Sequence, residues 1–275
     1  MKHCSVPFFI AAMLTLAGCY TNPVTGRKSL VLLSQGQELT LGQESFTSIR
    51  QKEKVSADPA LNARVSRVGK RIAGAVGSEL PDAKWEFVVF ESKDANAFAL
   101  PGGKVGVYTG LLELAENDSE LAIVMGHEIG HVIARHGAER MSEAMVISGV
   151  GALGTAALET KTSDPKTKQM FELAYGGLTT VGRVLPHSRG NESEADRMGA
   201  IYAARAGYDP RASISFWQKM MAQKNAAAKA GAGGMGDKVG ALLSTHPADE
   251  KRIADLKALM PQVVPVYEKN RGKFQ

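Results

Sequence analysis

The residues best suited to metal chemistry lie in the run His-Glu-Ile-Gly-His at 127–131. In a helix, residues four positions apart share a face, so His127 and His131 can both reach one ion. Glu128 lies about 100° further round the helix, where it can approach a water beside that ion without binding the ion itself. The pattern predicts a catalytic zinc site with Glu128 as general base. Its three fixed positions can also occur by chance on a polar helix face.

A second cluster of polar residues begins about 60 residues downstream, at Ser188. Glu192 and Asp196 are again four residues apart, so one helix face offers a ligand and, one turn later, a second carboxylate. Asp196 can accept the second ring N–H of a ligating histidine and fix its tautomer. Glu194 is expected to point away, facing solvent or pairing with Arg197. The alternative interpretation of this segment is an acidic surface helix.

Apolar periodicity predicts a mainly helical α+β fold that would position these side chains. One helix is expected to begin near Asn117, capped by it and by Glu120, and to run through Ile129. The other expected helices are 37–53, 59–76, 139–159, 165–182, 190–206, 210–224 and 248–260. Strands are expected at 85–90 and 104–108, with a short extended segment and turn at 96–103 and a flexible Ala/Gly loop at 226–240.

The first 18 residues predict an export signal. A short basic start is followed by an apolar run too short to anchor the chain, and the run ends in Leu-Ala-Gly-Cys, which resembles the lipobox of bacterial lipoproteins. An acylated Cys19 would hold the protein on a membrane. Because Tyr20 rather than Asp follows, the periplasmic face of the outer membrane is the expected location. Residues 19–34 would form the lipidated tether and 35–275 one domain; an ordinary signal peptide is the alternative.

The composition is typical of a globular protein and excludes several other classes. The 275 residues carry 33 Lys plus Arg against 28 Asp plus Glu, a net charge of +5 without basic runs, so no nucleic-acid partner is expected. Two cysteines cannot form a disulfide framework. The uncharged stretch 144–158 is too short to span a membrane. Gly149 to Gly154 matches a dinucleotide pattern, but its helical flanks argue against a bound nucleotide.

Taken together, these motifs resemble the M48 family of zinc metallopeptidases, particularly its bacterial periplasmic lipoproteins. The resemblance rests on Asn-Pro-Val-Thr-Gly at 22–26, the segment 96–103, the 127–131 helix, the segment 188–199, and Ser-Thr-His-Pro at 244–247 with Arg252. It implies a zincin-like domain with one zinc ion per chain, held by His127, His131 and Glu192. It also implies that the segment 96–108 lines the cleft, and that an edge strand near 104–108 pairs with an extended substrate. The substrate-binding residues expected from it are Asn96, Gly103, Val105 and Val107.

Histidines outside the ligand pair receive different expectations. His246 follows the Ala/Gly loop and can be a capping or surface residue. The resemblance instead places it at the active site, where it would either stabilise the oxyanion or occupy the open position of the zinc and keep the enzyme latent. Arg252 is expected to support the same region. His136 is expected on another helix face, exposed to solvent.

These features predict a membrane-anchored zinc endopeptidase that hydrolyses misfolded or unassembled cell-envelope proteins. The substrates follow from location and resemblance rather than from particular residues. An outer-membrane-tethered chaperone or assembly factor with a silent or latent zinc site is the alternative, and the intact Glu128 argues against it. A nucleotide-dependent oxidoreductase is a more distant alternative.

Overall fold

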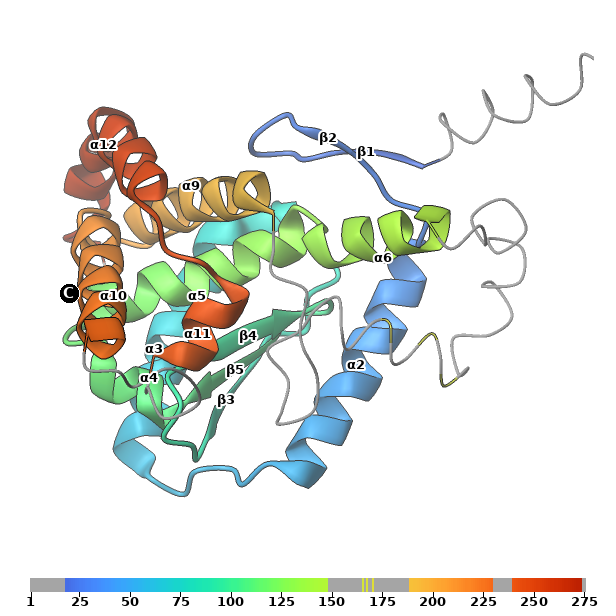
Figure 1. Cartoon of the computed structure of the whole chain (residues 1–275), viewed down its shortest axis with the longest axis horizontal. Helices are drawn as coiled ribbons and strands as arrows, with labels where there is room; N and C mark the ends of the chain where they lie inside the picture. Colours follow the sequence, from blue (N-terminus) through green and yellow to red (C-terminus); the bar gives the residue numbers. More distant parts are fainter. Residues whose placement is uncertain are drawn as a thin grey trace, which may run out of the picture.

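The computed structural model describes residues 18–147, 165, 167, 170, 188–229 and 239–273. Helices dominate them, and the strands form two small sheets (Figure 1). In chain order the elements are β1 (Cys19–Thr21), β2 (Lys28–Leu30), α2 (Gln35–Lys52), α3 (Pro59–Val76), the 3₁₀ turn η1 (Gly77–Glu79), β3 (Glu86–Phe90), β4 (Ala97–Leu100), β5 (Lys104–Tyr108), α4 (Thr109–Leu114), α5 (Asp118–Ile133), α6 (His136–Ile147), α9 (Arg189–Arg205), α10 (Ala212–Lys229), α11 (Gly240–Thr245) and α12 (Glu250–Asn270). The predicted α+β, mainly helical class is confirmed.

The observed helices differ most from the expected ones at α12. Proline at 261 predicts a helix end at 260, yet α12 continues to Asn270 with Pro261 and Pro265 inside it. Leu259 and Val263 are buried on either side of Pro261 and continue the apolar spacing. Tertiary packing therefore outweighs the unfavourable helix propensity of proline at these positions.

Some expectations concern residues that lie outside the described part of the chain. These are nearly all of the 1–18 signal segment, most of the expected helix at 165–182, the Gly149–Gly154 pattern, and most of the uncharged stretch 144–158. The described α6 covers the beginning of the helix expected at 139–159. Within the described ranges, no helix is both long enough and apolar enough to cross a membrane.

The three-stranded sheet has the order β3-β5-β4, with β3 parallel and β4 antiparallel to β5. β5 is therefore the central strand, and the expectation that 104–108 forms the edge facing the cleft is wrong. Val105 pairs with Phe87 on one side and with Ala99 on the other. A valine-rich strand has the same local pattern in the middle of a sheet as at its edge, so the sequence alone could not distinguish the two. The edge strand on the α5 side is β4, as Figure 1 shows.

Helix α5 runs through the middle of the domain between the sheet and α9 (Figure 1). Its N-cap Asn117 accepts a hydrogen bond from the backbone N–H of Glu120 at 3.0 Å. The Glu120 side chain binds the N–H of Glu116, not that of Asn117, so the expected reciprocal box is not formed. Every residue from Glu120 to Ile133 is buried. The polar side chains of α5 are thus held in the core, where each needs a partner.

The crossing of α5 with α9 depends on two glycines in direct contact. A Cβ atom added to Gly199 would lie 2.8 Å from the backbone nitrogen of His127 and 3.2 Å from the carbonyl carbon of Gly126. A Cβ atom added to Gly126 would lie 3.1 Å from the carbonyl oxygen of Gly199. No side chain fits between these backbones, so the helices approach closely beside His127.

The segment expected as a tether contains a β-hairpin that packs on the domain. β1 and β2 pair antiparallel, with Cys19 opposite Leu30. The Tyr20 hydroxyl donates to the carbonyl of Ile133 at 2.5 Å, and the Arg135 guanidinium lies 5.1 Å from the Tyr20 ring. The hairpin therefore rests on the C-terminal end of α5.

Gly199→Ala should destabilise the protein by about 1–2 kcal/mol, because overpacking against rigid backbone outweighs the gain in helix propensity. Urea unfolding measures the change. Gly74→Ala in α3 is the matched control, since an added Cβ there meets nothing within 4 Å. It should stabilise the protein by roughly 0.5–1 kcal/mol. Equal stabilisation by both substitutions would contradict the close helix crossing.

Candidate metal centre

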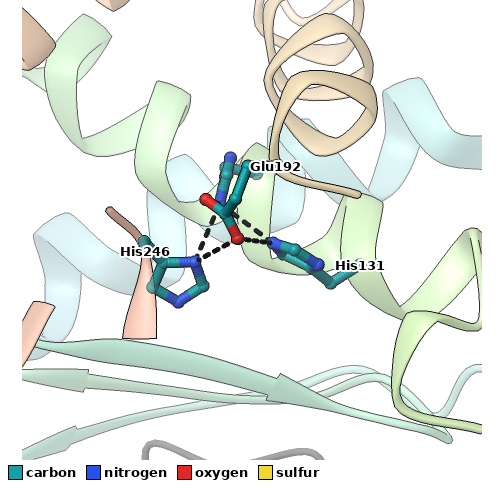
Figure 2. A group of neighbouring side chains, drawn as sticks. His131, Glu192 and His246 are labelled. Carbon is teal, nitrogen blue, oxygen red and sulfur yellow. Dashed lines mark hydrogen bonds and ion pairs between the residues drawn. The ribbon is translucent and has the colours of Figure 1, made fainter. Parts of the chain in front are cut away.

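Three helices bring four potential metal ligands together. His127 and His131 come from α5, Glu192 from the first turn of α9, and His246 from the residue that ends α11. Helix α9 begins at its N-cap Ser188, whose side chain accepts from the N–H of Asn191. All four ligand residues are buried, and Figure 2 shows His131, Glu192 and His246 converging on one point.

The distances between the ligand atoms match those of a single-ion site. His127 Nε2 lies 3.0 Å from His131 Nε2 and 3.2 Å from His246 Nδ1. Glu192 Oε1 lies 3.3 Å from His131 Nε2 and 3.1 Å from His246 Nδ1. Nitrogen and oxygen ligands arranged tetrahedrally around zinc are separated by about 3.3 Å. The four residues each place one ligand atom within 4.8 Å of the other three.

The chemistry of this donor set fits a zinc ion. Three imidazole nitrogens and a carboxylate oxygen face one another, and two facing imidazole nitrogens can share only one hydrogen. A cation satisfies all four lone pairs at once. Glu128 adds a second indication, because its buried Oε1 has no hydrogen-bond partner among the described residues. These residues can therefore hold Zn²⁺, which agrees with the prediction of a metal site.

Asp196 connects the site to a buried arginine. Its Oδ1 lies 3.0 Å from His127 Nδ1, the contact expected of a carboxylate that fixes a ligand tautomer. Arg252 donates to both Asp196 oxygens at 2.7 and 2.8 Å and lies 2.9 Å from Glu192. Trp217 donates to Asp196 at 3.1 Å, and its ring stacks 3.9 Å from the guanidinium. One cation thus balances two buried carboxylates.

The electrostatics of the site follow from burial and these partners. Burial raises the pKa of Glu128. Burial would also raise the pKa of Asp196, but Arg252 and His127 hold it below its usual range. Burial lowers the pKa values of His131 and His136, and the neutral form of His131 is the one that binds metals. For His127, burial is outweighed by the contacts with Asp196 and Glu192, which raise its pKa to about 9. The carboxylates beside Arg252 thus stay charged, while Glu128 has the raised pKa that suits a general base.

His246 lies between the ligand cluster and Glu128. Its Nδ1 faces Glu192, and its Nε2 lies 3.4 Å from Glu128 Oε1. The carbonyl of the following Pro247 accepts from Arg252 at 2.9 Å. The sequence-based alternatives of a surface or purely capping histidine do not agree with this position, because the side chain is buried within the site.

Two expectations about neighbouring polar residues are wrong. His136 is fully buried instead of exposed, and Glu194 is buried instead of facing solvent or pairing with Arg197. His131 Nδ1 lies 2.8 Å from His136 Nδ1, and His136 Nε2 lies 2.9 Å from Glu194 Oε2. A bend between α5 and α6 at Arg135, with φ of 55°, turns His136 back toward the ligand helix. An uninterrupted helix would place His136 on another face than His131. The prediction from residue spacing was therefore wrong.

The residues expected to bind substrate lie in the sheet and outside the ligand cluster. Val105 and Val107 are completely buried in the central strand, so their backbones have no free edge for a peptide. Gly103 lies in the turn before β5, with φ of 79° and close to Trp85. Asn96 precedes β4 and accepts a hydrogen bond from the N–H of Tyr108 through its carbonyl. The strand assignment behind Gly103, Val105 and Val107 is therefore corrected.

Comparison with known proteins agrees with this geometry. Residues 59–260 match the profile of Peptidase family M48. The chain belongs to this family. The predicted membership of the M48 family is thereby confirmed, and with it the prediction of a zinc metallopeptidase.

Named relatives of this M48 chain come from mitochondria and from bacteria. It is 32% identical to mitochondrial metalloendopeptidase OMA1 of Schizosaccharomyces pombe over 87% of this chain and 66% of that protein. The corresponding protein of Saccharomyces cerevisiae is 31% identical over 94% of this chain and 76% of its own length. The beta-barrel assembly-enhancing protease of Escherichia coli is 29% identical over 92% of this chain. The chain spans about half the length of that bacterial relative.

Sequence reasoning missed two residues that contact the site. Trp217 packs on Arg252 and binds Asp196, but a tryptophan at helical spacing carries no signal that separates it from ordinary core. His136 could have been found only by recognising the break at Arg135 between two helical segments.

Replacing Arg252 by Met should leave Glu192 and Asp196 without their shared cation and lower the free energy of unfolding by about 3–5 kcal/mol. Arg252→Lys should recover only part of the lost stability, because an ammonium group lacks the planar guanidinium that binds two carboxylate oxygens at once. Urea unfolding of metal-free protein measures both. Lys251→Ala, which removes an exposed ion pair with Asp255 on the same helix, should change stability by less than about 1 kcal/mol. Wild-type stability in Arg252→Met would show that the charges are balanced elsewhere.

Proposed function

We propose that this M48 chain is a zinc-dependent endopeptidase acting on misfolded or unassembled cell-envelope proteins. The observation that carries the enzymatic part is the position of Glu128. Its buried Oε1 lies beside a cluster of four potential zinc ligands, 3.4 Å from His246 Nε2, and a purely structural zinc site needs no such base.

Each residue of the site has a distinct role in this proposal. His127, His131 and Glu192 hold the ion, which when bound activates water and stabilises the charge that develops on the peptide carbonyl. Glu128 accepts the proton of the attacking water and delivers it to the leaving amine. Asp196 orients His127, and Arg252 keeps Asp196 and Glu192 charged.

The geometry favours His246 as a latch over a group that stabilises the oxyanion. Its Nδ1 is as close to His127 Nε2 and Glu192 Oε1 as the other ligand atoms are to one another. With an ion held by His127, His131 and Glu192, a nitrogen at that distance would fill the position otherwise open to water. Substrate must then displace His246 before water and peptide can reach the site, which keeps the enzyme inactive in this conformation.

The outer edge of β4 supports the binding of an extended peptide. Asn96 and Tyr108 form a hydrogen-bonded pair, so in the antiparallel register the next such pair is Phe98 with Gly106. The backbone N–H and C=O groups of Ala97 and Ala99 therefore point away from β5, and the Ala97 N–H donates to the Asn96 side-chain oxygen at 3.0 Å, which a peptide would have to replace. An extended peptide can add to this edge through main-chain bonds, with little sequence selectivity. β4 takes the role that the sequence assigned to 104–108.

The cellular location in this proposal rests on the N-terminal sequence and on the bacterial relatives. Cys19 is exposed at the start of β1, where acylation would not disturb the core. We assign 1–18 as a lipoprotein signal and place the domain at the periplasmic face of the outer membrane. The name of the Escherichia coli relative, which refers to the assembly of β-barrels, agrees with envelope substrates.

Glu128→Gln should retain bound zinc and lose at least about 99% of casein hydrolysis, because it removes the base without removing a ligand. Zinc content and fluorescent-casein cleavage measure the two effects, and a chelator should abolish wild-type cleavage. The exposed Glu116→Gln on the loop before α5 should behave as wild type. A wild-type cleavage rate in Glu128→Gln would contradict the mechanism, and a zinc-loaded wild-type protein that cleaves nothing would favour a chaperone role.

His246→Ala should raise the rate of casein cleavage several-fold, since removal of the imidazole opens the fourth position. Zinc should remain bound through His127, His131 and Glu192. The same assay on zinc-saturated protein measures the change. A loss of cleavage with zinc retained would assign His246 a catalytic role instead of a latch.

A further inference from the structure

The second nitrogen of His131 has an unusual partner for a metal-ligating histidine. Its Nε2 faces the ligand cluster, so its Nδ1 carries the hydrogen when Nε2 binds the ion. For His127 the equivalent atom meets the carboxylate of Asp196, but for His131 it meets His136 Nδ1 at 2.8 Å. The acceptor is thus a second imidazole.

A carboxylate one step further fixes the tautomer of that imidazole. His136 Nε2 lies 2.9 Å from Glu194 Oε2, and an ionised carboxylate only accepts hydrogen bonds. His136 therefore carries its hydrogen on Nε2, which leaves a lone pair on Nδ1 for the N–H of His131. The two contacts form one chain of donors and acceptors with a single consistent direction, from His131 through His136 to Glu194.

Glu194 is in turn held by the turn between β1 and β2. The Asn22 side chain donates to Glu194 Oε1 at 2.8 Å, the Thr25 hydroxyl donates to the same oxygen, and Arg27 donates to Oε2. Arg27 also binds Glu139 of α6 through two bonds of 2.7 and 2.8 Å. The polar side chains of this turn are thus directed inward, onto the carboxylate that ends the chain.

We propose that His136 and Glu194 are positioning residues for the metal ligand His131, and that the seating of the β1–β2 turn on Glu194 sets how tightly zinc is held. The proposal rests on the assignment of His131 as a zinc ligand. It gives the hairpin a role in the metal site although none of its residues reaches the ligand cluster. Loss of such partners of a ligating histidine weakens metal binding about 10–100-fold.

Two single-oxygen deletions in the hairpin separate this role from general stability. Thr25→Val removes the hydroxyl that binds Glu194, whereas Tyr20→Phe removes the hydroxyl that binds the carbonyl of Ile133. Thr25→Val also removes the acceptor of the Arg27 backbone N–H at 3.3 Å, so it costs the turn two hydrogen bonds where Tyr20→Phe costs the hairpin one. Of the two residues, only Thr25 contacts Glu194. Thr25→Val should weaken zinc binding about three- to tenfold, and Tyr20→Phe should leave it within twofold of wild type.

His136→Phe keeps the ring volume and removes the hydrogen bonds to both His131 and Glu194. It should weaken zinc binding about 10–100-fold. His136→Gln restores an acceptor and should recover part of the affinity. Competition with a chromophoric chelator measures the zinc Kd of the full chain, and the visible spectrum of Co²⁺-substituted protein reports the ligand geometry. The spectrum should change in His136→Phe and return toward wild type in His136→Gln. If His136→Phe does not fold, Glu194→Gln tests the same link.

The outcomes distinguish this inference from the proposed function. If wild-type protein binds no zinc, or if His131→Ala binds it as tightly as wild type does, the ligand assignment itself fails. If His131→Ala loses zinc but His136→Phe keeps the wild-type Kd and Co²⁺ spectrum, the positioning chain is wrong. Equal weakening by Thr25→Val and Tyr20→Phe would overturn the part played by the hairpin turn.

Discussion

The direct backbone contact between α5 and α9 is the constraint on which the site depends. His127 and His131 lie on one helix and Glu192 and Asp196 on the other, and the helices meet at Gly126 and Gly199. A Cβ atom at Gly199 would lie 2.8 Å from the backbone nitrogen of His127, so the helices would have to move apart by about 1 Å to reach ordinary van der Waals contact. This shift is roughly half the length of a bond between zinc and a histidine nitrogen. The ligand distances are thus determined by backbone packing and not by flexible side chains.

The burial of so many ionisable groups at this crossing is balanced by two sets of polar contacts. On one side Arg252 binds Asp196 and Glu192 beneath the ring of Trp217. On the other side Glu194 is surrounded by His136 and by the hairpin turn. Removal of one partner from such a buried set leaves an uncompensated charge, so each set must remain intact. The two sets come from opposite ends of the sequence: Arg252 lies on α12, and the residues around Glu194 include the N-terminal hairpin.

The site could be predicted from sequence where its residues are close together along a helix. The i and i+4 spacings of His127 with His131 and of Glu192 with Asp196 indicate shared faces, because helical periodicity alone decides which of these side chains lie together. The strand order β3-β5-β4 could not be obtained in this way, because local composition does not specify which strand lies in the middle. The positions of His136 and Glu194 were predicted wrongly for a related reason: a single residue with positive φ, Arg135, redirects the chain and changes which side chains meet.

Arg252 has a consequence for how a peptide could enter. The guanidinium that binds Glu192 and Asp196 also holds the carbonyl of Pro247, the residue after His246. Lifting this stretch of backbone therefore breaks a bond to the group that balances both carboxylates, whereas rotating the imidazole of His246 about its own side-chain bonds does not. Rotation leaves the guanidinium in place and needs no rearrangement of the loop. Under the proposed function, a substrate would therefore displace the His246 ring while the backbone at Pro247 stays bound to Arg252.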